Sequence, residues 1–216
     1  MSIVLVTGTD TGVGKTFVAC ALAHALRARG RRVGVVKPVE TGVEGEPGDA
    51  RALADAARDP SPLDDICPYR LRAPLAPSVA AAREGVTIDV DAIVALILRR
   101  ATTVDVLLVE GAGGLLVPIS GTTTYLDLAE RLGAPLLVVA ANRLRTVNHA
   151  ALTARVAEAS RVPVLGFVLS QPQATTDISA DSNADTIQTV TGLRCLGMLP
   201  HLVSPEAAAG RLVVDV

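Results

Sequence analysis

Six short, uninterrupted apolar runs constrain the fold of this 216-residue chain more than any other feature. The runs are rich in Val, Leu and Ile and do not alternate with polar residues, which is typical of parallel strands buried on both faces. Stretches with helical periodicity separate them. The expected strands are Ile3–Thr7, Val33–Lys37, Val106–Glu110, Pro135–Ala140, Val164–Leu169 and Arg194–Met198. The expected helices are Lys15–Arg29, Asp89–Arg100, Tyr125–Arg131, Asn148–Ala159 and Ala180–Val190. This alternation predicts an α/β fold with a doubly wound, mainly parallel sheet flanked by helices.

The length and composition fit a single domain that covers residues 1–216. Half of the residues are apolar and 19% are charged, which is enough apolar material for a large core. No segment is rich enough in Pro, Gly or Ser to act as a linker. The stretch Val43–Pro77 is the least regular, and long irregular segments inside compact domains tend to be functional.

The charge and the apolar runs also exclude several classes of partner. The formal net charge is −2 and aromatic residues make up 2%, so neither electrostatics nor base stacking favours nucleic acid. No apolar run approaches the roughly 20 residues that span a bilayer, and Ile3–Val6 is too short for a signal-peptide core. Three cysteines without a Cys-x-x-Cys pair favour reduced thiols. We therefore expect a cytoplasmic protein with no nucleic-acid or membrane partner.

A glycine-rich segment joins the first expected strand to the first expected helix. It reads Gly8-Thr-Asp-Thr-Gly-Val-Gly-Lys15-Thr16. Glycines let backbone N–H groups surround phosphate oxygens, and the helix N-terminus adds positive potential. Lys15 can reach the β- and γ-phosphates, while the Thr16 hydroxyl can ligate Mg²⁺. The pattern departs from the strict phosphate-binding loop (P-loop), since Thr9 stands six residues before Lys15 where glycine is expected. With strand, loop and helix in register, we interpret it as a P-loop that binds a nucleoside triphosphate.

Three further segments lie where the expected fold places ligands, near the carboxyl ends of strands. They read Lys37-Pro-Val-Glu-Thr41-Gly42, Val109-Glu110-Gly-Ala-Gly-Gly114 and Asn148-His149-Ala-Ala-Leu-Thr153. Together with the P-loop, these segments resemble the dethiobiotin synthetase family, and the resemblance runs from Ser2 to about Leu202. It implies ATP- and Mg²⁺-dependent carboxylation and ring closure of 7,8-diaminononanoate with CO₂, which gives dethiobiotin, ADP and phosphate in biotin biosynthesis. It also implies a homodimer.

The resemblance assigns roles to individual residues. Lys15 and Lys37 are the implied catalytic residues. The implied metal site consists of Thr16, Asp49 and Glu110. The implied substrate contacts are Thr11, Lys37, Thr41 and, from the other subunit, Asn148. The implied nucleotide-binding residues are Gly12, Val13, Gly14, Lys15, Thr16, Phe17, Asp49, Glu110, Gly111, Ala112, Gly113, Ser170, Gln171, Pro200, His201 and Leu202.

Elementary electrostatics supports these roles, although each has a plainer alternative. A carbamate that attacks a γ-phosphoryl group brings two anions together, so catalysis depends on positioning and on positive charge. The alternatives are that Lys37 extends from a strand end toward solvent, that Asp49 caps a helix beginning near Ala50, that Glu110 is a solvated strand terminus and that Asn148 is an N-cap.

The chain also departs from the family at two places. The family often has an acid where this chain has Gly12. It commonly has an Asn-Asp-like pair that reads adenine where this chain has Ser170-Gln171-Pro172. The base preference therefore stays open.

Other functions remain as alternatives. A P-loop switch ATPase of the partitioning or septum-positioning kind would have a second lysine four residues before the last loop glycine, where this chain has Asp10. An amidating ligase related to the cobyrinate amidases would need an additional glutaminase domain. An inactive nucleotide-binding subunit would not need Lys15, Lys37, Asp49 and Glu110 together.

Overall fold

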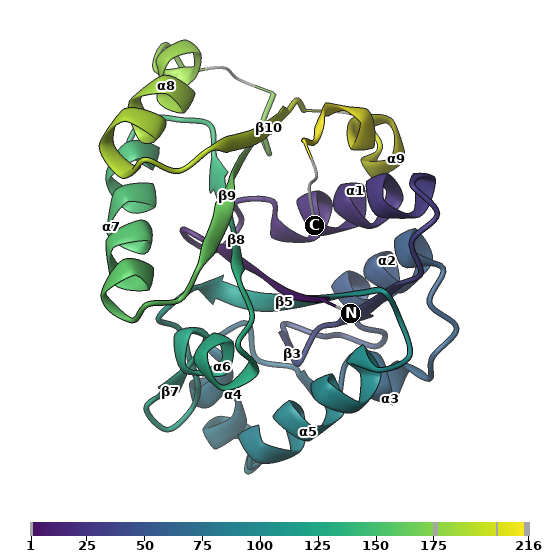
Figure 1. Cartoon of the computed structure of the whole chain (residues 1–216). Coiled ribbons are helices and arrows are strands. Elements are labelled where there is room, and N and C mark those ends of the chain that lie inside the picture. Colours follow the sequence, from purple (N-terminus) through teal and green to yellow (C-terminus); the bar gives the residue numbers. More distant parts are fainter. Residues whose placement is uncertain (1, 175–176, 202, 214–216) are drawn as a thin grey trace.

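The computed structural model describes residues 2–174, 177–201 and 203–213. Within these residues, six strands form one parallel sheet in the order β10-β9-β8-β1-β5-β2. They are β1 (Ser2–Gly8), β2 (Val33–Val36), β5 (Val106–Gly114), β8 (Leu136–Ala141), β9 (Val164–Ser170) and β10 (Cys195–Leu199). All six expected strands are present, and helices cover both faces of the sheet (Figure 1). The predicted doubly wound architecture is confirmed.

Four short strands lie outside this sheet. β3 (Val39–Thr41) pairs in parallel with β4 (Tyr69–Leu71), and β6 (Pro118–Ser120) pairs antiparallel with β7 (Thr123–Thr124). The helices are α1 (Lys15–Ala28), α2 (Gly48–Ala57), α3 (Leu63–Ile66), α4 (Pro77–Glu84), α5 (Val90–Ala101), α6 (Tyr125–Leu132), α7 (Thr146–Ala159), α8 (Ala180–Thr191), α9 (Pro205–Ala208) and the 3₁₀ turn η1 (Ala209–Arg211). All five expected helices are present, and each end lies within two residues of the expected one.

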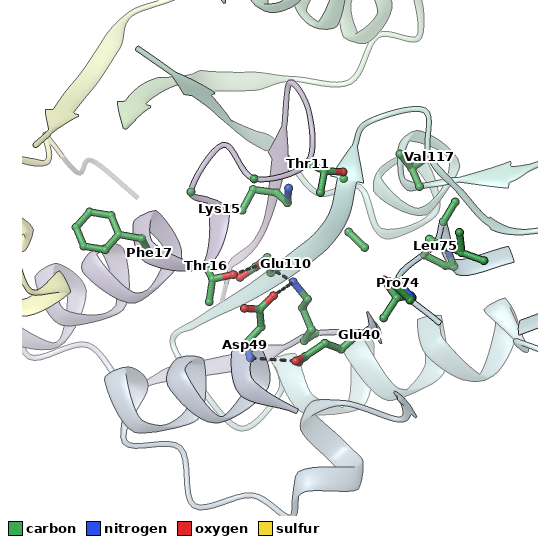
Figure 2. A pocket seen from close by; sticks show the side chains of 18 of the residues that line it. Thr11, Lys15, Thr16, Phe17, Glu40, Asp49, Pro74, Leu75, Glu110 and Val117 are labelled. Carbon is green, nitrogen blue, oxygen red and sulfur yellow. Dashed lines mark hydrogen bonds and ion pairs between the residues drawn. The ribbon is translucent and has the colours of Figure 1, made fainter. Parts of the chain in front are cut away.

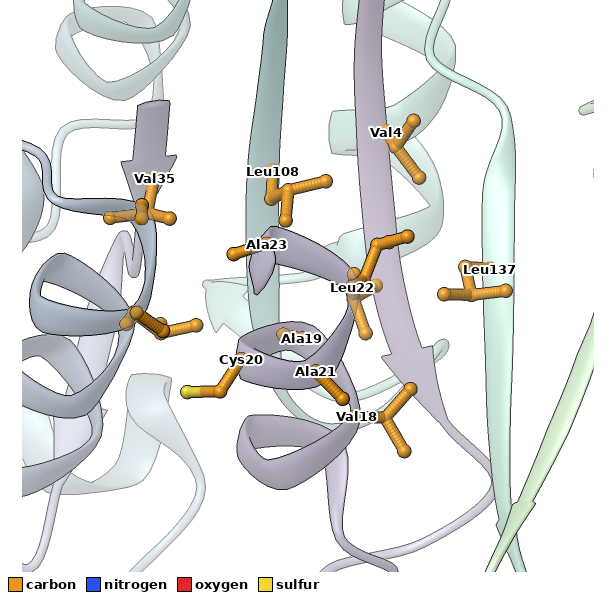
Figure 3. Packing of buried hydrophobic residues seen from close by; sticks show 14 of the residues in the cluster. Val4, Val18, Ala19, Cys20, Ala21, Leu22, Ala23, Val35, Leu108 and Leu137 are labelled. Atoms are coloured by element: carbon orange, nitrogen blue, oxygen red, sulfur yellow. The ribbon is translucent and has the colours of Figure 1, made fainter. Parts of the chain in front are cut away.

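Burial on both faces explains why the strands lack alternation. In β1, Val4 and Val6 pack toward α1, α2 and α9, whereas Leu5 packs toward α4, α5 and α6. The first of these clusters surrounds α1, whose alanines allow the helix to lie close against the sheet (Figure 3). The central residues of such a strand, Val4 to Val6 in β1, are buried on both faces and are all apolar.

The irregular stretch Val43–Pro77 contains more regular structure than its sequence indicates, namely α2, α3, β4 and the start of α4. A buried ion pair between Asp59 and Arg100 fastens this stretch to α5. Asp59 also accepts a hydrogen bond from the Val35 N–H at 2.9 Å, and Arg100 donates to the Asp65 carbonyl at 2.9 Å. These partners lie 24 to 41 residues apart, so no local pattern could reveal them.

The strand order indicates where on the sheet a ligand would bind. The chain winds from β1 toward β2 and β5 on one side and toward β8, β9 and β10 on the other. The carboxyl end of β1 therefore lies at a topological switch point, where open α/β sheets bind ligands. Along the described part of the chain, every helix is too short or too polar to span a lipid bilayer.

Candidate active site

Close packing around Gly8, where β1 meets the loop before α1, explains why this loop departs from the strict P-loop pattern. A Cβ atom at Gly8 would lie 2.8 Å from the Asp10 carbonyl oxygen and 2.9 Å from a Val13 methyl group. A side chain at Gly8 would therefore force the loop open. The Thr9 N–H donates to the Val139 carbonyl at 2.9 Å, which ties the loop to β8. In this loop the glycine is needed at Gly8, and a side chain is tolerated at Thr9.

The other end of the loop is fixed by β9. Gly14 adopts φ +88° before α1, and a Cβ atom there would lie 2.5 Å from the Ser170 hydroxyl oxygen. That hydroxyl donates to the Val13 carbonyl at 2.5 Å. The bond turns this carbonyl toward β9, and α1 begins directly afterwards at Lys15 with no side-chain cap. Free N–H groups at such a helix start can receive a phosphate.

Lys15 reaches back across the loop from the first turn of α1. Its Nζ donates to the Asp10 carbonyl at 3.1 Å, and only 7% of the residue is exposed. Burial and the nearby charge of Lys37 lower the pKa of Lys15 to about 8, although Glu110 and Asp49 act in the opposite direction. Without a bound ligand, Lys15 therefore begins to lose its proton at mildly alkaline pH.

A second lysine is buried among carboxylates at the ends of β2 and β5. Lys37 is 3% exposed, and its Nζ donates to Asp49 Oδ2 at 2.9 Å and to Glu110 Oε1. Glu110 is 1% exposed and also accepts a hydrogen bond from Thr16 Oγ1 at 2.8 Å (Figure 2). Burial acts to lower the pKa of Lys37, but Glu110 and Asp49 raise it above its ordinary value. Lys37 is therefore charged at physiological pH.

This cluster disagrees with three of the plainer alternatives. Lys37 does not extend toward solvent, because its ammonium group is enclosed by two carboxylates. Glu110 is buried and not a solvated strand terminus. Asp49 does not cap α2, whose N-cap is Pro47 without a side-chain hydrogen bond. Burial acts to raise the pKa of Asp49, yet the charge of Lys37 and the hydrogen bond from its ammonium group bring it below its ordinary value.

Glu40, in β3, is a member of the site that the sequence reasoning did not identify. Its Oε1 accepts the Asp49 N–H at 3.0 Å and its Oε2 accepts the Ala50 N–H at 2.9 Å. Burial raises the pKa of Glu40, although the two N–H groups act to lower it. Glu40 lies inside the segment Lys37–Gly42, so the sequence feature that could have identified it is a carboxylate next to Thr41, just after an expected strand.

The oxygen atoms of Thr16, Asp49 and Glu110 fit a magnesium ion. Glu110 Oε2 is buried and has no hydrogen-bond partner, which leaves a carboxylate oxygen available to a cation. In the described residues, no three His, Cys, Asp or Glu side chains converge as a metal site. Mg²⁺ is commonly held by one or two carboxylates together with phosphate oxygens and water, so this donor set suits Mg²⁺ bound with a nucleotide.

A cavity of ≈ 730 Å³ opens beside these groups. The P-loop, β3, the segment before α4 and the end of β5 form its walls (Figure 2). The predicted residues that line it are Thr11, Gly12, Gly14, Lys15, Thr16, Phe17, Lys37, Thr41, Asp49, Glu110, Ala112 and Gly113. The unpredicted ones include Glu40, Val117 and the segment 74–77, whose two prolines lie in the irregular stretch.

A second cavity of ≈ 280 Å³ adjoins the first and shares three lining residues with it, Gly14, Phe17 and Pro172. The predicted residues Ser170, Gln171, Pro200 and His201 also line this second cavity. Leu202 was predicted here too, but it lies outside the described residues. The two cavities together have space for a triphosphate along the loop and a base beside β9 and β10.

Three predicted residues do not line either cavity. Val13 is buried, although its carbonyl receives the Ser170 hydroxyl. Gly111 lies against the buried ring of Tyr125, where a Cβ atom would be 3.2 Å from the ring. Asn148 is exposed in the first turn of α7, which begins two residues earlier at Thr146. The N-cap of α7 is Arg145, so the interpretation of Asn148 as an N-cap is wrong.

Comparisons with known proteins cover nearly the whole chain. A family model described as an AAA domain matches residues 3–208. The ATP-dependent dethiobiotin synthetase BioD of Anaeromyxobacter dehalogenans strain 2CP-C is 48% identical over 200 residues, which are 90% of this chain and 88% of the relative. The protein of the same name from Anaeromyxobacter sp. strain Fw109-5 is 46% identical over 198 residues, 91% of this chain and 89% of the relative.

Solved structures share the fold at low sequence identity. The signal recognition particle 54 kDa protein of Aeropyrum pernix K1, in complex with GDP, has a TM-score of 0.55 and 20% identity. It matches 98% of this chain, which spans 43% of that protein. FtsY of Mycoplasma mycoides has a TM-score of 0.53 and 14% identity, over 92% of this chain and 59% of that protein. These similarities support the P-loop NTPase fold.

Proposed function

The chain belongs to the ATP-dependent dethiobiotin synthetase family, and from this premise we propose how its residues close a ring on a diamine. It is an ATP-dependent ligase of biotin biosynthesis. We propose 7,8-diaminononanoate, CO₂ and ATP as substrates, with dethiobiotin, ADP and phosphate as products. The observation that carries the proposal is Lys37, buried and charged at the edge of the cavity beside the P-loop.

The proposed reaction needs positive charge at one place. One amine of the substrate adds to CO₂ and loses a proton, giving a carbamate. A carbamate oxygen attacks the γ-phosphorus of ATP, and ADP leaves. The second amine then attacks the carbonyl carbon and loses a proton, so that the C–N bond closes the ring as the bond to phosphate breaks and phosphate leaves. Two anions approach each other in the phosphoryl step, so positioned cations lower its barrier. Lys15 and Lys37 both line the cavity where this charge would gather.

The P-loop side of the cavity suits the nucleotide. The glycine-rich turn and the N-terminus of α1 offer backbone N–H groups to the phosphates. The adjoining cavity beside Ser170, Gln171 and His201 has space for the base. We assign the remaining loop residues Gly12 to Phe17, together with Gly111 to Gly113, to nucleotide binding on the basis of the family.

Magnesium is the proposed cofactor. When bound, it would supply positive charge that neutralises the phosphates. Thr16, Asp49 and Glu110 are the residues that would hold it. A buried carboxylate oxygen without a hydrogen-bond partner, Glu110 Oε2, supports this assignment.

Thr11 and Thr41 line the same cavity and are the proposed contacts to the diamine end of the substrate. Asn148 does not line it, so its proposed contact to the substrate carboxylate requires a second subunit. A homodimer, a single domain over residues 1–216 and a cytoplasmic location complete the proposal. The switch-ATPase alternative is not favoured, because the curated relatives at 46–48% identity share one ligase name.

Phosphate release measured with and without the proposed substrates tests this function. We expect release to rise sharply only when diaminononanoate and bicarbonate are both present, with dethiobiotin detected by mass spectrometry. Lys37→Ala serves as the matched variant, since losing one positioned charge of this kind costs roughly 10²–10³ in rate while nucleotide binding is retained. Equal hydrolysis without diaminononanoate would instead favour the switch ATPase, and near-normal turnover in the variant would disprove the role of Lys37.

A further inference from the structure

We propose that Glu40 is a positioning residue that fixes the Asp49 carboxylate for the metal-bound nucleotide. The inference rests on the proposed function, because it assumes that Asp49 supports Mg²⁺. Glu40 is 8% exposed at the edge of the cavity. It touches neither Lys37 nor Glu110 through a hydrogen bond of its own. It acts through the backbone of α2.

The geometry links β3 to the first turn of α2. Glu40 lies in β3, and its two carboxylate oxygens accept the N–H groups of Asp49 and Ala50 in the first turn of α2. A carboxylate that accepts backbone N–H groups forms charge-assisted hydrogen bonds and stabilises a helix N-terminus. Figure 2 shows Glu40 and Asp49 on adjacent elements below the cavity.

This form of capping differs from ordinary capping in one respect. The N-cap of α2 is Pro47, which has no side-chain acceptor, so the helix does not satisfy its first N–H groups locally. A local Ser or Asp cap would stabilise the helix without fixing its position. Glu40 caps α2 from β3, so the helix end is held in register with the strand that follows Lys37.

The position of Asp49 depends on that register. Its carboxylate meets Lys37 Nζ at 2.9 Å and contributes to the cluster with Thr16 and Glu110. The Asp49 side chain is 46% exposed, so packing alone does not immobilise it. Partners that orient metal-binding groups typically contribute 10- to 100-fold to metal affinity. Loss of the Glu40 hydrogen bonds to the first turn of α2 should therefore lower the affinity for Mg²⁺ more than it lowers the affinity for the nucleotide.

Calorimetric titration of a non-hydrolysable ATP analogue at a series of Mg²⁺ concentrations tests this inference without turnover. For Glu40→Gln, which loses one of the two acceptors, we expect the half-saturating Mg²⁺ concentration to rise about tenfold. Affinity for the analogue without Mg²⁺ should stay unchanged. Glu46→Gln is the matched control, because it removes the same charge next to α2 from an exposed side chain that pairs with exposed Arg51. Its Mg²⁺ dependence should equal that of the wild type.

A double variant separates positioning from simple capping. Pro47→Ser places a hydroxyl at the N-cap of α2, where it can accept the N–H groups that Glu40 releases. In Glu40→Gln/Pro47→Ser, we expect the melting temperature to return to the wild-type value while the half-saturating Mg²⁺ concentration stays raised. Recovery of both would show that Glu40 is only a cap and would overturn the proposal. So would a folded Glu40→Gln variant with the wild-type Mg²⁺ dependence.

If Glu40→Gln does not fold, Glu40→Asp provides the same test, since it keeps the charge but is one methylene too short to hold both N–H groups. The outcome is also distinguishable from failure of the proposed function. Suppose that the wild-type protein binds the analogue with Mg²⁺ but its phosphate release does not rise with diaminononanoate. That result would contradict the proposed substrate and would not affect the proposed role of Glu40.

Discussion

Lys15 and Lys37 differ in how firmly each holds its proton, although both are buried beside the same cavity. Lys37 is enclosed by Asp49 and Glu110, which raise its pKa. Lys15 donates to the Asp10 carbonyl, and burial together with the charge of Lys37 lowers its pKa to about 8. The two environments therefore differ in effect: Lys37 stays charged at physiological pH, whereas Lys15 begins to lose its proton near pH 8 unless anionic phosphates stabilise the charge.

Nucleotide affinity should consequently fall as the pH rises above about 8. Bound phosphates raise the pKa of Lys15, so the complex holds a proton that the free protein has lost, and binding at higher pH must take that proton up. Calorimetry in buffers of different ionisation enthalpy should detect little proton uptake at about pH 7 and approach about one proton per site near pH 9. Lys15→Arg keeps its charge at both pH values and should lose the uptake. Absence of uptake in the wild type would contradict the lowered pKa.

Secondary-structure elements with strong local signals could be predicted from the sequence. The buried strands appeared as apolar runs, and Asp89, at the predicted start of its helix, caps α5 through a 3.0 Å hydrogen bond from the Ala92 N–H. The arginine-rich end of α1 followed by Gly30, at φ +77°, also matches its sequence pattern. Elements stabilised by distant contacts could not be predicted. The first turn of α2 is capped by Glu40, which lies in β3. A strand of only three residues, such as β3, is too short to show a recognisable hydrophobic pattern.

The same division applies to the site. Lys15, Thr16 and Glu110 follow buried strands or the glycine loop, so their place at the sheet edge could be predicted from chain order. Glu40, in the short strand β3, and the segment 74–77 before α4 reach the cavity along a chain path that depends on tertiary packing. Contacts such as Asp59 with Arg100, 41 residues apart, determine that path and leave no periodic trace.

The ends of β9 and β10 should read the base only weakly. The Ser170 hydroxyl is occupied by the Val13 carbonyl, so this position supports the loop. The Gln171 amide beside it offers both a donor and an acceptor, which suits several bases. Losing one selective hydrogen bond costs about 1 kcal/mol, so we expect ATP, GTP and CTP to compete within roughly fivefold of one another.

Competition binding with the three triphosphates measures this preference. Ser170→Ala is the control, because it removes support from the loop and should weaken all three nucleotides alike. A preference of several hundredfold for ATP would show that another segment, such as Pro200–His201, reads the base.

The whole molecule presents a surface that supports the proposed homodimer. Leu116 and Leu152 are 56% and 57% exposed and line an apolar cavity of ≈ 400 Å³ between the end of β5 and α7. Thr11 and Val117 line both this cavity and the one that holds Lys37. The two cavities therefore adjoin at Thr11 and Val117, and the second lies beside two exposed leucines that a second copy would cover.

A shared site follows if the substrate carboxylate meets Asn148 of a second subunit. A nine-carbon acid extends beyond a site between Lys37 and the phosphates, and its far end needs an anion-binding group. The first turn of α7 provides free N–H groups and a favourable dipole worth about 0.3–1 kcal/mol. In a twofold dimer, two such helices serve two equivalent sites. Asn148→Ala should then be strongly impaired in turnover while binding ATP normally, because the nucleotide cavities do not include Asn148.

Mixing inactive variants tests this arrangement. Lys15→Ala and Asn148→Ala each disable both sites of their own dimer, but a mixed dimer has one site with both residues intact. Equal amounts with free exchange should recover roughly a quarter of wild-type turnover, because half the dimers are mixed and half their sites are intact. Lys15→Ala mixed with Lys37→Ala is the matched control and should recover nothing, since both lysines belong to one chain's cavity. If Asn148→Ala is inactive, native mass spectrometry confirms exchange and mixing still restores no activity, each subunit completes its own site and Asn148 acts within a single chain.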